Sequence, residues 1–184
     1  AKLKYIIYLH IIMGETAMKN SACFIGHRKI NDTPELWKSL DNIVNGLIEN
    51  GTVNFLFGDR SEFNDLCFEI VGINKKIHPE IKRIKFRVNY EDADDYTMQF
   101  LIGSHDESIF PEAAVGSGKN VYIARNRALI DESDVCVFYY DENYTPPRRR
   151  TDKKAISDYQ PNSGTALAYG YAVKKQKFII NCFK

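Results

Sequence analysis

Strand-like and helix-like segments alternate along this chain, and that alternation limits its fold more than any other feature. Apolar segments predict five strands, at 22–25, 52–57, 81–88, 135–140 and 177–183. Helical spacing of apolar residues follows four start points, near residues 34, 63, 120 and 163. Strands separated by helices are typical of a parallel sheet. We therefore predict an α/β, doubly wound, Rossmann-like three-layer fold with a five-stranded parallel sheet.

The length of 184 residues suits one domain, which we assign to 21–184. We interpret 1–20 as an N-terminal extension, because Met18 lies just before the first convincing strand. Its apolar run at 5–13 is too short to span a bilayer, which needs about 20 residues. The formal net charge of +1 argues against a bulk nucleic-acid or membrane binder, although a local basic patch remains compatible with it.

The four cysteines form no C-x-x-C pair, so neither a zinc ribbon nor a redox motif is indicated. Cysteines within apolar runs behave as small core residues under reducing conditions, which favours the cytoplasm. Acidic residues at 92, 94 and 95 lack a recognisable metal-ligand spacing. We predict no metal and no cofactor, and the sequence leaves any catalytic residue unknown.

Ligands of doubly wound sheets bind beyond the carboxyl ends of the strands, so the residues there are the candidates. Gly26, His27 and Arg28 follow the first strand. The glycine permits close approach of a ligand, the histidine can donate a hydrogen bond, and the arginine can grip a phosphate. The alternative is a turn glycine beside two solvated side chains.

Two helix starts are candidate anion sites, because backbone N–H groups and the helix dipole favour negative charge there. Gly58 and Arg60 lie before one of them, where Ser61 equally suits a simple helix cap. The sequence Ser163-Gly164-Thr165 opens the last helix, and we interpret it as a phosphate cradle in preference to a cap.

Two further groups of side chains are candidates for ligand contact. The basic run 148–150 fits a solvated loop better than a nucleic-acid contact. One or two of the many tyrosines could stack on a base, whereas most should pack in the core.

Several segments in order resemble the SLOG superfamily, which groups the DprA, YpsA-like and LOG Rossmann-type proteins. The similar segments are Phe24-Ile25-Gly26-His27-Arg28, Arg125-Asn126-Arg127-Ala128-Leu129-Ile130, Ser133-Asp134 and Ser163-Gly164-Thr165-Ala166. The G-H-R form is similar to the YpsA-like group. The resemblance runs from about Ser21 to the end, with 91–118 unmatched.

This resemblance implies a five-stranded sheet, frequent homo-oligomers and a nucleotide-related ligand. It implies that seven residues face that ligand: Gly26, Arg28, Arg125, Asn126, Ser163, Gly164 and Thr165. LOG phosphoribohydrolases carry a P-G-G-x-G-T-x-x-E motif, and here Ala168 stands in place of its glutamate. Hydrolysis by that route would lack its general acid or base.

We therefore expect binding or sensing of a nucleotide-derived, phosphate-bearing small molecule at the carboxyl ends of the strands. One alternative is an enzyme acting on a nucleoside N-glycosidic bond, with a carboxylate from Asp59, Glu62 or Asp141. Another is single-stranded DNA binding, as the DprA resemblance implies. The expected partners are thus a small molecule, with nucleic acid as an option, and a second copy of the chain, but no membrane.

Overall fold

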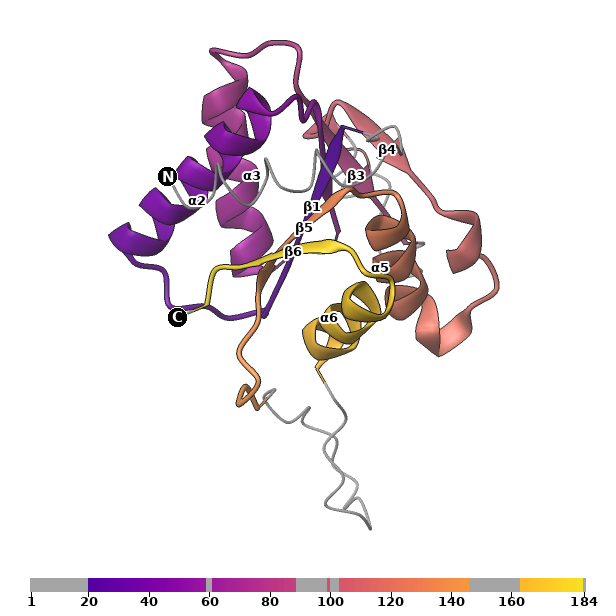
Figure 1. Ribbon diagram of the computed structural model, residues 1–184. Helices are drawn as coiled ribbons and strands as arrows, with labels where there is room; N and C mark the ends of the chain where they lie inside the picture. Colours follow the sequence, from indigo (N-terminus) through magenta and orange to yellow (C-terminus); the bar gives the residue numbers. More distant parts are fainter. Residues whose placement is uncertain (1–19, 59–60, 89–98, 100–102, 146–162, 184) are drawn as a thin grey trace.

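The computed structural model describes residues 20–58, 61–88, 99, 103–145 and 163–183. Nearly all of the expected N-terminal extension, as well as Asp59, Arg60 and the run 148–150, lies outside these residues. Figure 1 shows a central sheet with helices on both faces, which confirms the expected α/β three-layer arrangement.

The sheet has six parallel strands in the order β4-β3-β2-β1-β5-β6, so the prediction of five strands was wrong. The strands are β1 (Ser21–Gly26), β2 (Asn54–Phe57), β3 (Lys82–Phe86), β4 (Glu107–Ile109), β5 (Val135–Tyr139) and β6 (Phe178–Asn181). Strands β2, β3 and β4 follow one another on one side of β1, and β5 and β6 lie on its other side. The topological switch point therefore lies between β1 and β5, where ligands of such sheets bind.

Side-chain caps explain where three of the helices begin. Thr33 Oγ1 accepts the Leu36 N–H at 3.2 Å and Pro34 takes the first position of α2 (Pro34–Glu49). Ser61 Oγ accepts the Asn64 N–H at 3.1 Å and starts α3 (Glu62–Lys75). Ser163 likewise caps α6 (Gly164–Lys174), whereas α5 (Val121–Asp131) begins without a side-chain cap. These starts agree with the sequence to within one residue.

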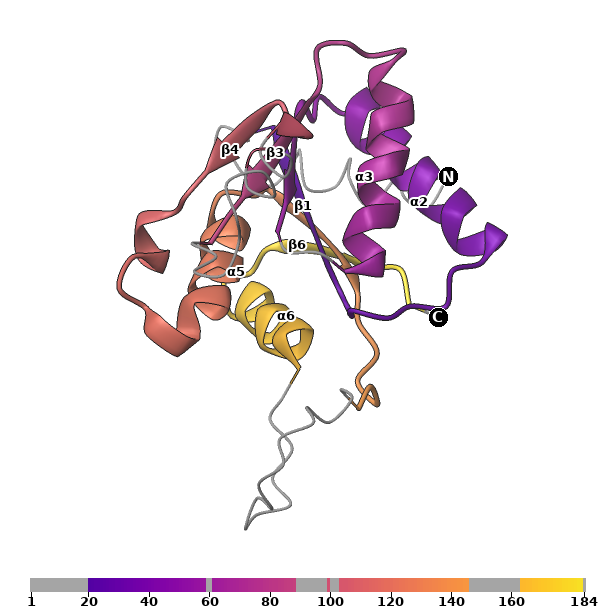
Figure 2. The same cartoon turned by 180° about the vertical axis from the view of Figure 1, so that it is seen from behind.

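Helices α2 and α3 cover one face of the sheet, and α5 and α6 cover the other, as the two opposite views show (Figures 1 and 2). Each face has its own apolar core. Strand β5 is buried along its whole length, which confirms the prediction from its apolar sequence. All four cysteines are buried, free thiols, as predicted. Within the described part of the chain, every helix is too short or too polar to cross a bilayer.

The missed strand, β4, lies in the segment 91–118, whose acidic and then glycine-bearing sequence predicts a long functional loop with at most a short helix. The rest of its described part includes two short 3-10 helices, η1 (Glu112–Ala114) and η2 (Gly118–Asn120). Strand β4 has only three residues at the sheet edge, and its outer positions are exposed. Such a strand lacks the apolar alternation on which sequence-based prediction depends.

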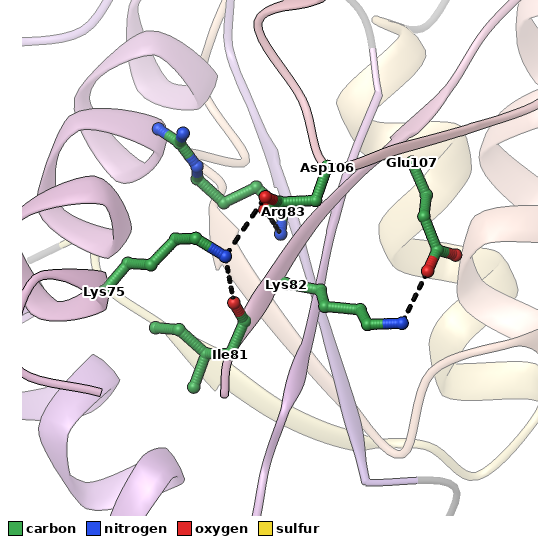
Figure 3. A network of polar contacts seen from close by, with 6 residues as sticks. All are labelled: Lys75, Ile81, Lys82, Arg83, Asp106 and Glu107. Atoms are coloured by element: carbon green, nitrogen blue, oxygen red, sulfur yellow. Dashed lines mark hydrogen bonds and ion pairs between the residues drawn. The ribbon is translucent and has the colours of Figure 1, made fainter. Parts of the chain in front are cut away.

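Polar contacts hold β4 in place (Figure 3). The Asp106 carboxylate accepts the Arg83 N–H at 2.8 Å, and its other oxygen lies 3.1 Å from Lys75 Nζ of α3. Lys82 Nζ lies 2.6 Å from the Glu107 carboxylate. Partial burial acts to raise the pKa of Asp106, but these hydrogen bonds and charges outweigh it and leave the pKa below its usual range.

Candidate functional site

The candidate site lies at the carboxyl ends of β1 and β5, along the lower edge of the sheet in Figure 1. The N-terminal end of α6 lies at the same edge. This is the switch point of the sheet, where sequence reasoning placed the ligand.

Gly26 at the end of β1 is required by packing. A Cβ atom there would lie 2.4 Å from the ring of Phe63, which is completely buried at the start of α3. The glycine thus allows α3 to approach β1 closely. The expected close approach of a ligand to this backbone stays a prediction.

His27 is 2% exposed, so it is not the solvated side chain of the alternative interpretation. Its Nε2 lies 3.0 Å from the backbone nitrogen of Asp141 and 3.3 Å from the carbonyl oxygen of the same residue. Its ring stacks on Tyr144, with the centroids 3.8 Å apart. Desolvation lowers the pKa of His27, partly offset by its hydrogen bond and charge interaction with Asp141. The neutral ring therefore accepts the Asp141 N–H and fixes the turn that follows β5.

Arg28 is exposed at the same edge of the sheet. Beside it, hydrogen bonds and an ion pair connect the backbone before α2 to Glu62 of α3. The Arg28 carbonyl accepts the Glu62 N–H at 3.0 Å. The Glu62 carboxylate accepts the Ile30 N–H at 3.0 Å and forms an ion pair with Lys29. The hydrogen bonds from Lys29 and Ile30 lower the pKa of Glu62, opposite to what a general acid at neutral pH requires.

The two candidate helix starts differ in how many of their N–H groups the protein itself uses. At α3, the Glu62 N–H bonds to the Arg28 carbonyl and the Asn64 N–H bonds to Ser61. At α6, Ser163 Oγ accepts the Ala166 N–H at 3.1 Å. No described residue accepts the N–H groups of Gly164 and Thr165. The anion-site interpretation therefore suits α6 better, and capping accounts for α3.

Arg125 and Gly58 lie at the ends of β2 and β3, not at the switch point. The Arg125 side chain is 2% exposed and donates to the Phe86 carbonyl at 3.4 Å. Its Nε donates to Asn126 at 2.9 Å. A Cβ at Gly58 would lie 3.2 Å from this guanidinium, so the glycine makes room for it. Arg125 thus packs against the carboxyl ends of β2 and β3 and stabilises them.

Asn126 belongs with the switch point, because it and Gly164 line one small hollow between α5 and the first turn of α6. Arg127 lines the same hollow, and its guanidinium lies 5.1 Å from the ring centroid of Tyr171. The structure thus brings together the starts of two motifs 38 residues apart in sequence. Arg127 was not among the predicted ligand residues, although the R-N-R segment contains it.

Aromatic rings gather at the end of β5. Tyr140 stacks on Tyr169 of α6 with centroids 4.5 Å apart, and both rings are half-buried. Asn181 of β6 accepts the Tyr140 N–H at 3.0 Å and donates to the Tyr140 carbonyl at 2.9 Å, which fixes the backbone of Tyr140. The sequence showed many tyrosines but not which of them stack at this edge.

Asp141 was the other described carboxylate of the enzyme alternative. It accepts the Asn143 N–H at 2.8 Å and so closes the turn after β5. No group of three or more His, Cys, Asp or Glu side chains placed to hold a metal ion occurs among the described residues.

No protein-family model and no curated protein sequence matches this chain. A structure of DNA processing protein A from Helicobacter pylori, concerned with its single-stranded DNA binding mode, matches with a TM-score of 0.50 and 19% identity. That match covers 86% of this chain and 63% of the other.

Two structures of the molybdenum cofactor carrier protein from Chlamydomonas reinhardtii are also similar, each at 12% identity. One has a TM-score of 0.48 and covers 86% of this chain and 73% of the other; the second has a TM-score of 0.45 and covers 89% and 76%. These likenesses concern the fold alone. The match with DNA processing protein A confirms the expected Rossmann-like fold, while membership of the SLOG superfamily and of its G-H-R group stays a prediction.

Proposed function

We propose that this SLOG-type domain binds a nucleotide-derived, phosphate-bearing small molecule at the switch point between β1 and β5. The observation that carries the proposal is the start of α6, where the N–H groups of Gly164 and Thr165 have no acceptor among the described residues. A helix N-terminus with available N–H groups attracts phosphate through both hydrogen bonds and the helix dipole.

The surroundings support a nucleotide over a bare phosphate. Arg28 is exposed at the end of β1 and carries the positive charge that a phosphate requires. The stacked pair Tyr140 and Tyr169 presents aromatic surface at the end of β5 for a base. In this proposal His27 does not touch the ligand but holds the turn beside it, because its ring is buried.

The test replaces Gly164, the first residue of α6, by proline. Proline at this position removes one N–H donor and leaves the helix intact, because its fixed φ suits the first turn. Ser163 before it has φ −61° and ψ 149°, which a following proline accepts. Apart from its two chain neighbours and the backbone of its own helix, no described atom lies within 4 Å of a Cβ built on Gly164, so the Cβ of the proline meets no clash.

The matched control is Gly164→Ala, which keeps the N–H group. Losing a hydrogen bond to a charged group weakens binding by roughly 1.5–3 kcal/mol, which is about tenfold or more in Kd. A thermal-shift screen of nucleoside mono- and diphosphates, cyclic nucleotides and ADP-ribose finds the ligand, and calorimetry gives its Kd for each variant. We expect the proline variant alone to bind weakly. Equal Kd values for the two variants would contradict the proposed phosphate site.

Single-stranded DNA is a second candidate, favoured by the same stacked tyrosines. Fluorescence anisotropy with a labelled oligo-dT at 50 and 200 mM salt tests it. DNA binding through phosphates predicts a steep loss of affinity with salt. Affinity that a Tyr169→Ala variant leaves unchanged would remove the support that stacking provides.

Self-association of the chain also stays a proposal. Leu167 and Val173 of α6 are 40% and 54% exposed, which is high for large apolar side chains. Light scattering after size exclusion measures the mass of the particle in solution, and a monomer at all concentrations would contradict self-association.

A further inference from the structure

One hollow in the described structure lies away from the switch point. It lies on the sheet face that carries α5, between that helix, the strands β2 and β3, and the segment that contains η1. Its volume is about 390 Å³. This is within the range of roughly 300–1,000 Å³ that small-molecule pockets occupy.

The topology of the sheet explains why space remains on this face. Connections from β1 to β2 and from β2 to β3 proceed in one direction, so right-handed crossovers place α2 and α3 on the opposite face. His105, which leads into β4, also packs on the α3 side, with its ring 4.6 Å from that of Phe68. Among the described elements, only α5 and η1 flank the hollow on its own face.

The chemistry of the hollow differs from that of the switch point. Its floor is apolar and consists of Leu56, Ile84 and Phe86 from β2 and β3. Two carboxylates lie among its lining residues, Glu112 of η1 and Glu132 just after α5. None of the described lining residues is a lysine, an arginine or a histidine. An anion would meet negative charge here, whereas a cation with an apolar body would meet complementary surfaces.

We propose that this hollow is a second binding site, for a small amphipathic organic amine. The apolar body of such a molecule packs on the side chains of β2 and β3, which removes apolar surface of both from contact with water. Its ammonium group lies toward the exposed Glu112, where both solvation and the carboxylate favour the positive charge. The site is independent of the proposed nucleotide site, which attracts the opposite charge at the carboxyl ends of β1 and β5.

Three probes of nearly the same size and shape test this proposal: 4-phenylbutylamine, 4-phenylbutanol and 4-phenylbutanoate. Their dissociation constants for the full chain are measured by NMR titration. An exposed ion pair contributes about 0.2–1 kcal/mol, so we expect the amine to bind up to about fivefold more tightly than the alcohol. The carboxylate should bind most weakly. Binding of the carboxylate as tight as that of the amine, or binding of none of the three, would overturn the proposal.

Variants locate the site. Ala113→Trp in the η1 segment and Ala128→Leu on α5 each add side-chain volume inside the hollow. Both should weaken binding of the amine at least fivefold, and having two guards against one of them failing to fold. Asn42→Trp, on the exposed surface of α2 at the other face, is the matched control and should leave binding unchanged.

Glu112→Gln tests the charge preference separately. It should reduce the advantage of the amine over the alcohol while leaving the binding of the alcohol unchanged. Amine binding that persists in both filling variants would show that the probe binds elsewhere and would refute the proposed site.

Discussion

Substituting Gly26 by alanine tests whether this glycine serves packing or ligand binding. The added Cβ would lie 2.4 Å from Cδ1, 2.5 Å from Cγ and 2.6 Å from Cβ of Phe63. Side-chain Cβ atoms essentially never approach other heavy atoms closer than 3.0 Å, so β1 and α3 have to separate. Phe63 cannot rotate away, because it is completely buried within the core under α2 and α3.

The expected magnitude follows from this clash. Overpacking a well-packed core costs typically 1–3 kcal/mol, and we expect Gly26→Ala to lie near the upper end because the obstructing atoms are held on a helix. For a domain of this size each kcal/mol lowers Tm by roughly 2–4 °C, so Tm should fall by about 5–10 °C. Urea unfolding followed by circular dichroism measures the free energy directly.

A double variant separates the clash from other effects. Phe63→Ala costs stability by itself, but in the Gly26→Ala background it should cost less, since it also removes Cγ and Cδ1, the two closest of the clashing atoms. Gly164→Ala is the control, because its Cβ would meet no described atom within 4 Å beyond its own helix and chain neighbours, and its stability should not fall. If the free energy of unfolding of Gly26→Ala lies within about 0.5 kcal/mol of the parent value, the packing argument is refuted and ligand binding becomes the better explanation for Gly26.

Three other outcomes are expected. Burial lowers the pKa of His27 below 6.5, so as the pH falls through 6.5 the unfolded chain takes up a proton that the folded chain does not. The free energy of unfolding, measured with urea, should therefore drop between pH 7.5 and 5.5. The drop should be smaller in His27→Gln. Burial raises the pKa of Cys182 to about 12, so a thiol reagent at pH 8 should label it only on unfolding, and rapid labelling of the folded chain would contradict its burial. Asp106→Asn weakens the contacts to Lys75 and to the Arg83 N–H and should cost about 1 kcal/mol, whereas an unchanged free energy would mean that β4 is held by other contacts.

Much of the candidate site was predictable because parallel strands place all their carboxyl ends at one edge. Given that rule, Gly26, Arg28 and Ser163 could be assigned to a common edge without any coordinates. The sequence could not show that His27 turns inward onto Tyr144, because the direction of a side chain after a strand depends on the turn that follows β5. The family resemblance alone assigned Arg125 to the ligand, and the sequence could not show that its guanidinium is buried beneath the ends of β2 and β3.

What the sequence determined by itself is the alternation of elements, the helix caps and the core strands. Those depend on local spacing and on short-range hydrogen bonds, such as the one from the Leu36 N–H to Thr33, which neighbouring residues specify. Only the tertiary structure decided the sixth strand, the hollow above β2 and β3, and the N–H groups at the start of α6 that no described residue accepts. Strand β4 forms because Asp106 finds partners 23 and 31 residues earlier in the chain, at Arg83 and Lys75, and long-range pairing leaves no periodic pattern in a three-residue segment.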